Sequence, residues 1–126
     1  MRVYRIQDAN NLGPLHYKST IRGNVKRHNE PGEHQAYKDG KPVNISFIGM
    51  NARFAWDSLR SMYGFIRFPR AVDDAGYTVV VYDVPDSECI TWEDGQVAFW
   101  QEDAVKVDEF LYSEVGKKMF ASRKER

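Results

Sequence analysis

The chain has 126 residues, no formal net charge, and 42% hydrophobic and 13% aromatic residues. This composition excludes intrinsic disorder and predicts one hydrophobic core. The single cysteine, Cys89, excludes an intramolecular disulfide, and no apolar stretch is long enough for a signal segment or a membrane span. We therefore expect a cytoplasmic protein with one domain over residues 1–121 and a charged, frayed tail over residues 122–126.

The zero net charge hides a strong segregation of charge along the chain. Residues 1–82 carry 12 basic and 7 acidic side chains, residues 83–115 carry one basic and ten acidic, and residues 116–126 carry five basic and one acidic. Such blocks predict two surfaces of opposite sign. The two surfaces either attract each other within the fold or face partners, and the sequence leaves both interpretations open.

The N-terminal third predicts one strand followed by a long loop. Arg2–Ile6 alternates polar and apolar residues, which is typical of a strand, and Gly13-Pro14 marks a turn after it. Residues 16–42 are polar and poorly periodic, so we expect a long irregular loop. Loops of this length are uncommon in compact domains and are often functional.

The middle of the chain predicts the main helix. A second strand is expected over Val43–Ile48, and Asn51 is a suitable N-cap for a helix over about 51–63. Pro69 and Gly76 then suit the two ends of a shorter helix. The main helix would place its apolar residues on one face: Ala52, Ala55, Trp56, Leu59 and Tyr63.

The C-terminal third predicts an antiparallel meander. Residues 77–84 are apolar on both alternating faces, so we expect a central strand covered on both sides. Residues 88–92 and 96–100 flank Glu93-Asp94-Gly95 and predict a hairpin. A short strand over 104–107 and a helix over 109–120 follow. The expected class is α+β, with a mainly antiparallel sheet, one main helix and short additional helices.

The sequence lacks the motifs of the common enzyme and metal sites. It has no P-loop, no Gly-x-Gly-x-x-Gly, no Gly-x-Ser-x-Gly and no His-Glu-x-x-His, and Cys89 is flanked by an acidic residue. Three histidines share the long loop, but they lack the flanking carboxylates typical of a metal site. We therefore expect no catalytic residues, no metal and no cofactor.

A basic stripe in the long loop is the predicted contact surface. Its residues are spaced so that a helix would present them on one side: Lys18, Arg22, Lys26 and Arg27, followed by His28. Such a stripe fits an acidic patch on a protein partner or on the chain itself. Nucleic acid is the alternative ligand, but the overall pI of about 6.8 is low for a nucleic-acid domain.

Parts of the chain resemble known proteins. Val3–Ile6, Gly13-Pro14, Gly76–Val84 and Gly95–Phe99 together resemble a group of small phage and prophage proteins. This resemblance implies an accessory role during infection, such as binding a host or defence protein as an anti-defence inhibitor.

The outline is also similar to that of ADP-ribosyltransferase-like domains. That second resemblance implies an NAD-type site with Arg5 on the first strand. Gln96 stands where the family has its catalytic glutamate, so transferase activity would be weak or lost.

Overall fold

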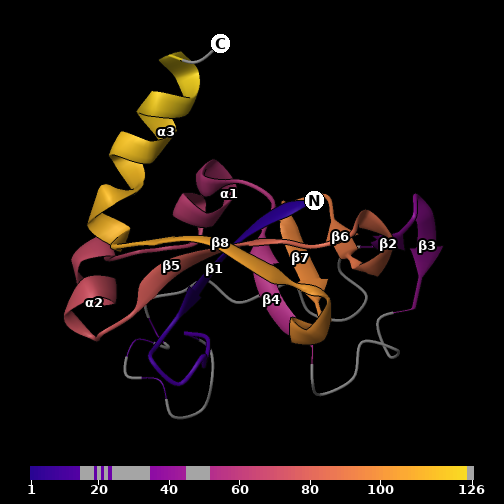
Figure 1. Ribbon diagram of the computed structural model, residues 1–126, viewed down its shortest axis with the longest axis horizontal. Helices are drawn as coiled ribbons and strands as arrows, with labels where there is room; N and C mark the ends of the chain where they lie inside the picture. Colours follow the sequence, from indigo (N-terminus) through magenta and orange to yellow (C-terminus); the bar gives the residue numbers. More distant parts are fainter. Residues whose placement is uncertain (15–18, 20, 22, 24–34, 45–51, 125–126) are drawn as a thin grey trace.

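The computed structural model describes residues 1–14, 19, 21, 23, 35–44 and 52–124. Within these residues, eight strands form one antiparallel sheet in the order β3-β2-β6-β7-β4-β1-β5-β8 (Figure 1). Three helices accompany the sheet, so the expected α+β class with mainly antiparallel strands is confirmed. The strands are β1 (Arg2–Gln7), β2 (Ala36–Lys38), β3 (Lys41–Val43), β4 (Arg53–Trp56), β5 (Thr78–Asp83), β6 (Ile90–Trp92), β7 (Gln96–Phe99) and β8 (Val105–Phe110). The helices are α1 (Leu59–Gly64), α2 (Pro69–Asp74) and α3 (Val115–Lys124), with 3-10 turns η3 (Asp86–Glu88), η4 (Gln101–Asp103) and η5 (Tyr112–Glu114).

Strands β1 and β5 form the longest pair in the sheet, and their register runs from Arg2 opposite Asp83 to Gln7 opposite Thr78. The sequence of β5 is apolar on both faces, and both faces are buried in separate clusters. A strand covered on both sides needs this near-continuous apolar sequence. The edge strand β8 pairs with the outer side of β5 and contains a β-bulge at Val107.

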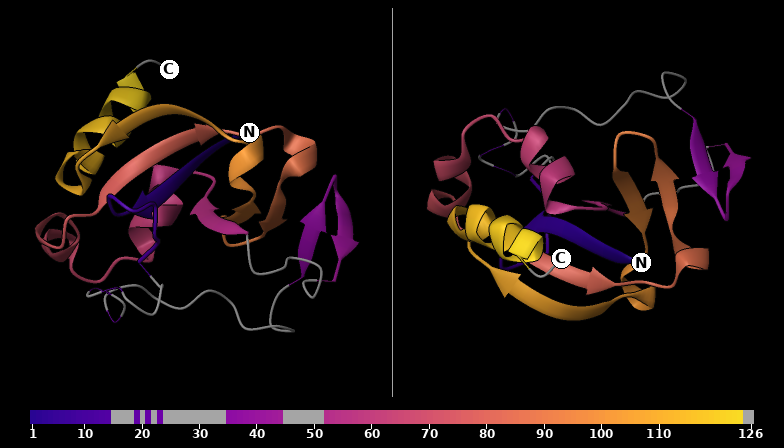
Figure 2. Two further views of the ribbon diagram at one scale, coloured as in Figure 1. Left: turned by 60° about the horizontal axis from the view of Figure 1, so that its bottom comes forward. Right: turned by 90° about the horizontal axis from the view of Figure 1, so that it is seen from above.

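The two faces of the sheet carry two different clusters. On one face, the buried side chains of β1, β4 and β5 pack against residues of the helices, such as Met62, Val72 and Val115. Figure 2 shows the three helices near the β1 and β5 end of the sheet, away from β2 and β3. On the opposite face, Val3 and Ala55 pack with further residues of β5, β7 and the segments that follow them. We refer to these as the helix face and the open face of the sheet.

The expected helix over about 51–63 is wrong in its first half. Arg53–Trp56 is strand β4, which pairs with both β1 and β7, and α1 begins only at Leu59. Ser58, whose side chain accepts a hydrogen bond from the backbone N–H of Ser61, is the N-cap. Small and aromatic residues at this spacing fit either structure, and pairing with two strands decided between them. Asn51 lies outside the described residues.

The expected irregular loop over residues 16–42 contains a short hairpin at its end. Strands β2 and β3 pair around Asp39 and Gly40, whose φ angles are 53° and 75°. Two successive positive φ angles are typical of the tight turn that Asp-Gly favours between antiparallel strands. Between residues 16 and 34, the structure describes only residues 19, 21 and 23. Residues 45–48 of the expected second strand also lie outside the described residues.

Strands β6 and β7 pair antiparallel across the turn at residues 93–95. The carbonyl of Gly95 accepts a hydrogen bond of 2.8 Å from the backbone N–H of Asp57, so the turn lies against the start of α1. A Cβ on Gly95 would lie 2.4 Å from the Ser61 Oγ, and its φ is 91°. Glycine is therefore required here both by the backbone and by the neighbouring side chain.

The C-terminal segment differs from the expected short strand and long helix. β8 extends to Phe110, and α3 begins only at Val115 and continues to Lys124. The carboxylate of Asp73 accepts hydrogen bonds from the backbone N–H groups of Tyr112 and Ser113, at 2.8 and 3.2 Å. These bonds hold the chain against α2 between strand and helix. The single domain and the frayed tail stay predictions.

Candidate functional site

A buried polar cluster lies on the open face of the sheet, around Arg5 of β1. Only 5% of Arg5 is exposed. Its guanidinium donates to the Gln7 Oε1 at 3.2 Å, the Phe54 carbonyl at 2.7 Å and the Asn11 carbonyl at 3.5 Å. The hydroxyl of Tyr82 also donates to Gln7 Oε1, and the Gln7 amide donates to the Asn11 side chain at 3.1 Å. The cluster thus ties β1, β4, β5 and the turn after β1 together.

Every one of these hydrogen-bond acceptors of Arg5 is neutral. Within the described residues the guanidinium has no ion pair, and a second cation, Arg53, donates to the same Asn11 carbonyl at 3.4 Å. Burial and the neighbouring charge of Arg53 lower the pKa of Arg5 to about 10. Arg5 is therefore still protonated at neutral pH, and within the described residues its buried positive charge forms no ion pair.

Arg5 and Gln96, the two residues of the expected NAD-type site, lie on opposite faces of the sheet. Tyr4 pairs with Trp56 and Trp56 pairs with Gln96, so these three residues share the helix face. Arg5 follows Tyr4 and points to the opposite face, because successive side chains alternate along a strand. The Gln96 amide donates to the Asp94 carboxylate at 2.6 Å, and its Oε1 is buried with no hydrogen-bond partner among the described residues.

The basic stripe stays a prediction. Its five residues, Lys18, Arg22, Lys26, Arg27 and His28, all lie outside the described residues. The same is true of the three histidines. Across the described ranges, no group of three or more His, Cys, Asp or Glu side chains is placed to hold a metal ion.

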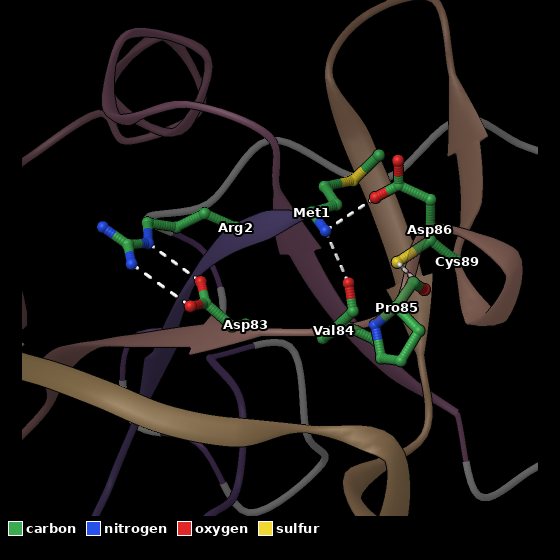
Figure 3. A network of polar contacts seen from close by, with 7 residues as sticks. All are labelled: Met1, Arg2, Asp83, Val84, Pro85, Asp86 and Cys89. Atoms are coloured by element: carbon green, nitrogen blue, oxygen red, sulfur yellow. Dashed lines mark hydrogen bonds and ion pairs between the residues drawn. The ribbon is translucent and has the colours of Figure 1, made fainter.

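The N-terminus and the end of β5 form an exposed polar corner (Figure 3). The terminal amine donates to the Val84 carbonyl at 2.5 Å and pairs with Asp86 at 2.6 Å. Arg2 donates to both carboxylate oxygens of Asp83, at 2.9 and 3.2 Å. Cys89 lies beneath this corner, and burial raises the pKa of its thiol. A buried thiol of this kind is a poor nucleophile.

Strand β8 presents an exposed edge. Val105 is 65% and Val107 43% exposed, although both belong to a strand of the sheet. Asp108 and Glu109 are exposed beside them, and each carboxylate pairs with a lysine: Lys118 at 3.4 Å and Lys106 at 2.9 Å. The exposed β8 surface therefore combines apolar and acidic residues, and it belongs to the acidic block of residues 83–115.

The comparison with protein families decides the origin of the chain. The family described as Bacteriophage T4 Y00F protein matches residues 1–113. The chain belongs to this family. The expected resemblance to small phage proteins is thus confirmed, whereas the expected similarity to ADP-ribosyltransferases has no support. No curated protein and no solved structure matches the chain.

The match to the Y00F family ends at residue 113, so it covers the whole sheet and stops just before α3. Both the buried arginine cluster and β8 lie within it. None of the helices in the described part of this Y00F protein is long and apolar enough to cross a membrane. Sequence reasoning had singled out Arg5 but not Arg53 or β8. From the sequence alone, the valines of β8 predict only a short strand. Their exposure becomes apparent once β8 is seen to lie at the edge of the sheet.

Proposed function

We propose that this Y00F family member is a non-enzymatic accessory protein that binds a protein of the infected cell through the outer edge of β8. The observation that carries the proposal is the exposure of Val105 and Val107 on an edge strand. In its narrower form, the partner is a host or defence protein, and the phage protein acts as an anti-defence inhibitor.

The two edges of the sheet differ in a way that favours β8. The opposite edge, β3, has three residues and contains Pro42, which lacks a backbone N–H. A short edge strand with proline is a common protection against unwanted strand pairing. β8 has six residues and no proline, and only β5 lies beside it in the sheet order. A partner strand added there would gain backbone hydrogen bonds and apolar contacts.

The charges around β8 indicate the chemistry of the partner. Residues 83–115 carry ten acidic side chains and one basic one, and Asp108 and Glu109 are exposed on β8 itself. The partner segment is therefore expected to be extended, apolar at alternate positions and basic between them. Complementary charge of this kind raises association rates and disfavours acidic partners.

The test is affinity purification from infected cells with three forms of the protein. The edge variant carries Val105→Lys and Val107→Lys, which place charge on the apolar positions of β8. The matched control carries the same two added lysines at Ala9 and Gly116, two exposed positions outside β8. The wild type and the control should retain the same protein, and the edge variant should lose it.

Direct binding and size measurements complete the test. The retained protein, once purified, should bind the wild type and the control at least about tenfold more tightly than the edge variant, since hot-spot residues cost more than ~1.4 kcal/mol when disrupted. Equal binding by all three forms would exclude β8 as the interface. A wild-type protein that dimerises through β8, while the edge variant is monomeric, would replace the host partner with a second copy of the chain.

A further inference from the structure

A second feature, independent of the β8 surface, is the buried positive charge of Arg5. Buried charges in proteins are normally paired with an opposite charge or a metal. Among the residues that the structure describes, the guanidinium donates to three acceptors, an amide oxygen and two backbone carbonyls. These acceptors account for three of its five N–H donors. Within the described residues, the remaining two donors and the net charge of Arg5 have no partner, so we consider them as donors to a ligand.

The second arginine makes the arrangement unusual. Arg53 on β4 and Arg5 on β1 point to the same face, and each donates one long hydrogen bond, of 3.4 and 3.5 Å, to the Asn11 carbonyl. Two guanidinium groups that converge on one neutral oxygen repel each other. An anion between them removes this repulsion and accepts hydrogen bonds from both.

Asp8, an acidic residue whose charge acts on Arg5, does not supply that anion. Burial, Arg53 and Tyr82 each affect the pKa of Arg5 more than Asp8 does. One of its carboxylate oxygens instead accepts hydrogen bonds from the backbone N–H groups of Asn10 and Leu12, at 2.8 and 3.0 Å. These bonds shape the turn after β1, so the acidic side chain serves the backbone rather than the arginines.

The turn is built closely around the guanidinium of Arg5. Asn11 has a φ of 63°, a left-handed conformation, and its side chain is held by Gln7. Gly13 lies so close that a Cβ there would be 3.0 Å from the Arg5 Nη2. Arg53 is only partly buried and forms the solvent side of the cluster. The arginine pair is therefore held in place before any ligand binds.

We infer that Arg5 and Arg53, with the turn at residues 11–13, form a binding site for a phosphate group. Guanidinium groups bind phosphate through paired hydrogen bonds, and a low local dielectric strengthens each of them. Arg53 contacts the phosphate from the solvent side, and the free donors of Arg5 contact it from the protein side. The phosphate is either free or the terminal group of a phosphate monoester such as a nucleotide.

The experiment measures phosphate binding to the whole protein by titration calorimetry and by the NMR signals of the arginine side-chain N–H groups. The probes are inorganic phosphate and adenosine monophosphate, with sodium chloride at equal ionic strength as the salt control. Arg53→Gln removes the charge on the solvent side, and Arg53→Lys keeps it without the paired donors. Arg67→Gln, on an exposed arginine outside the cluster, is the matched control.

The wild type and Arg67→Gln should bind phosphate at one site, and the Arg5 N–H signals should shift on binding. Arg53→Gln should weaken binding by at least about tenfold, because hydrogen bonds to charged groups are worth roughly 1.5–3 kcal/mol. The phosphate affinity of Arg53→Lys should lie between those of the wild type and Arg53→Gln. Because Arg53 is partly exposed, its variants are expected to fold, and the unchanged spectrum of the remaining protein verifies this.

Phosphate also stabilises folded proteins in general, because it is excluded from their surfaces. The deciding quantity is therefore the difference in phosphate affinity between the wild type and Arg53→Gln, and not any general effect of phosphate on stability. Equal affinity for the two proteins, or no shift of the Arg5 signals beyond the salt control, would overturn the inference. Tighter binding of the monophosphate than of free phosphate identifies a nucleotide-type ligand, and equal binding identifies the phosphate group alone as the ligand.

Discussion

The turn at Gly95 provides the sharpest test of the fold, because the structure offers a matched control for it. Gly95 and Gly76 both have positive φ angles, of 91° and 83°. A Cβ on Gly76 would meet nothing within 4 Å, whereas a Cβ on Gly95 would lie 2.4 Å from the Ser61 Oγ and 2.9 Å from the Asp57 Oδ1. Alanine at the two positions therefore separates backbone strain from steric overlap.

The expected costs follow from these two terms. A Cβ in the left-handed region costs about 1–2 kcal/mol, and the stiffer unfolded chain returns about 0.4–1 kcal/mol. Gly76→Ala should thus lower the free energy of unfolding by about 1 kcal/mol. Forcing a methyl group into an occupied space adds about 1–3 kcal/mol, so Gly95→Ala should cost about 2–4 kcal/mol.

Urea unfolding followed by fluorescence measures both costs, because the wild-type protein contains tryptophan on β4, β6 and next to β7. For a domain of this size, each kcal/mol corresponds to a change in Tm of about 4 °C. Gly95→Ala should therefore melt about 4–12 °C below Gly76→Ala. Equal costs for the two variants would show that the turn between β6 and β7 does not lie against α1 as described.

Two further predictions concern single side chains. Arg2, by its hydrogen bond and its charge, lowers the pKa of Asp83 in the folded protein from its ordinary value of 3.8. The ionised Asp83 therefore stabilises the fold above pH 3.8, and this contribution is lost as the pH falls through the lowered pKa of the folded state. The Tm of Asp83→Asn should therefore lie below that of the wild type at about pH 6 and converge with it at about pH 2. A constant difference in Tm over this range would contradict the ion pair between Asp83 and Arg2. Cys89 is buried and its thiol pKa is raised, so Ellman's reagent should label it only when urea unfolds the protein, whereas Ser87→Cys, at an exposed position, should react at once through the added thiol. Rapid labelling of native Cys89 would contradict its placement.

The sequence predicted best where a single local pattern determines the structure. The sequence of β1 alternates polar and apolar residues, and that of β5 is apolar over most of its length. The structure places both strands near their expected boundaries. The helix over 51–63 failed because the spacing of Ala52, Ala55 and Trp56 fits a helix as well as a strand. The choice depended on the pairing of β4 with β7, whose partner residues lie 40 to 46 positions further along the chain. No local sequence pattern reveals that pairing.

The candidate sites show the same limit. Arg5 was singled out from its place on the first strand, but its expected partner Gln96 lies on the opposite face of the sheet. Its actual neighbours, Asn11 and Arg53, come from a turn and from a strand that had been predicted as a helix. Side-chain direction on a strand depends on register, and register is set by pairing across the sheet. The sequence therefore identified Arg5 but not the residues that surround it.

The two proposed sites place opposite charges on different parts of one small domain. Arg5 and Arg53 lie on the open face, on β1 and β4, while the acidic β8 forms one edge of the sheet, with β5 between it and β1. The segregation of charge along the sequence thus corresponds, in the described residues, to charged groups on separate parts of the sheet. Because Arg53 and the valines of β8 share no contact, their variants should act independently. A double variant that lost more than the two separate effects would show instead that phosphate and protein partner bind one coupled surface.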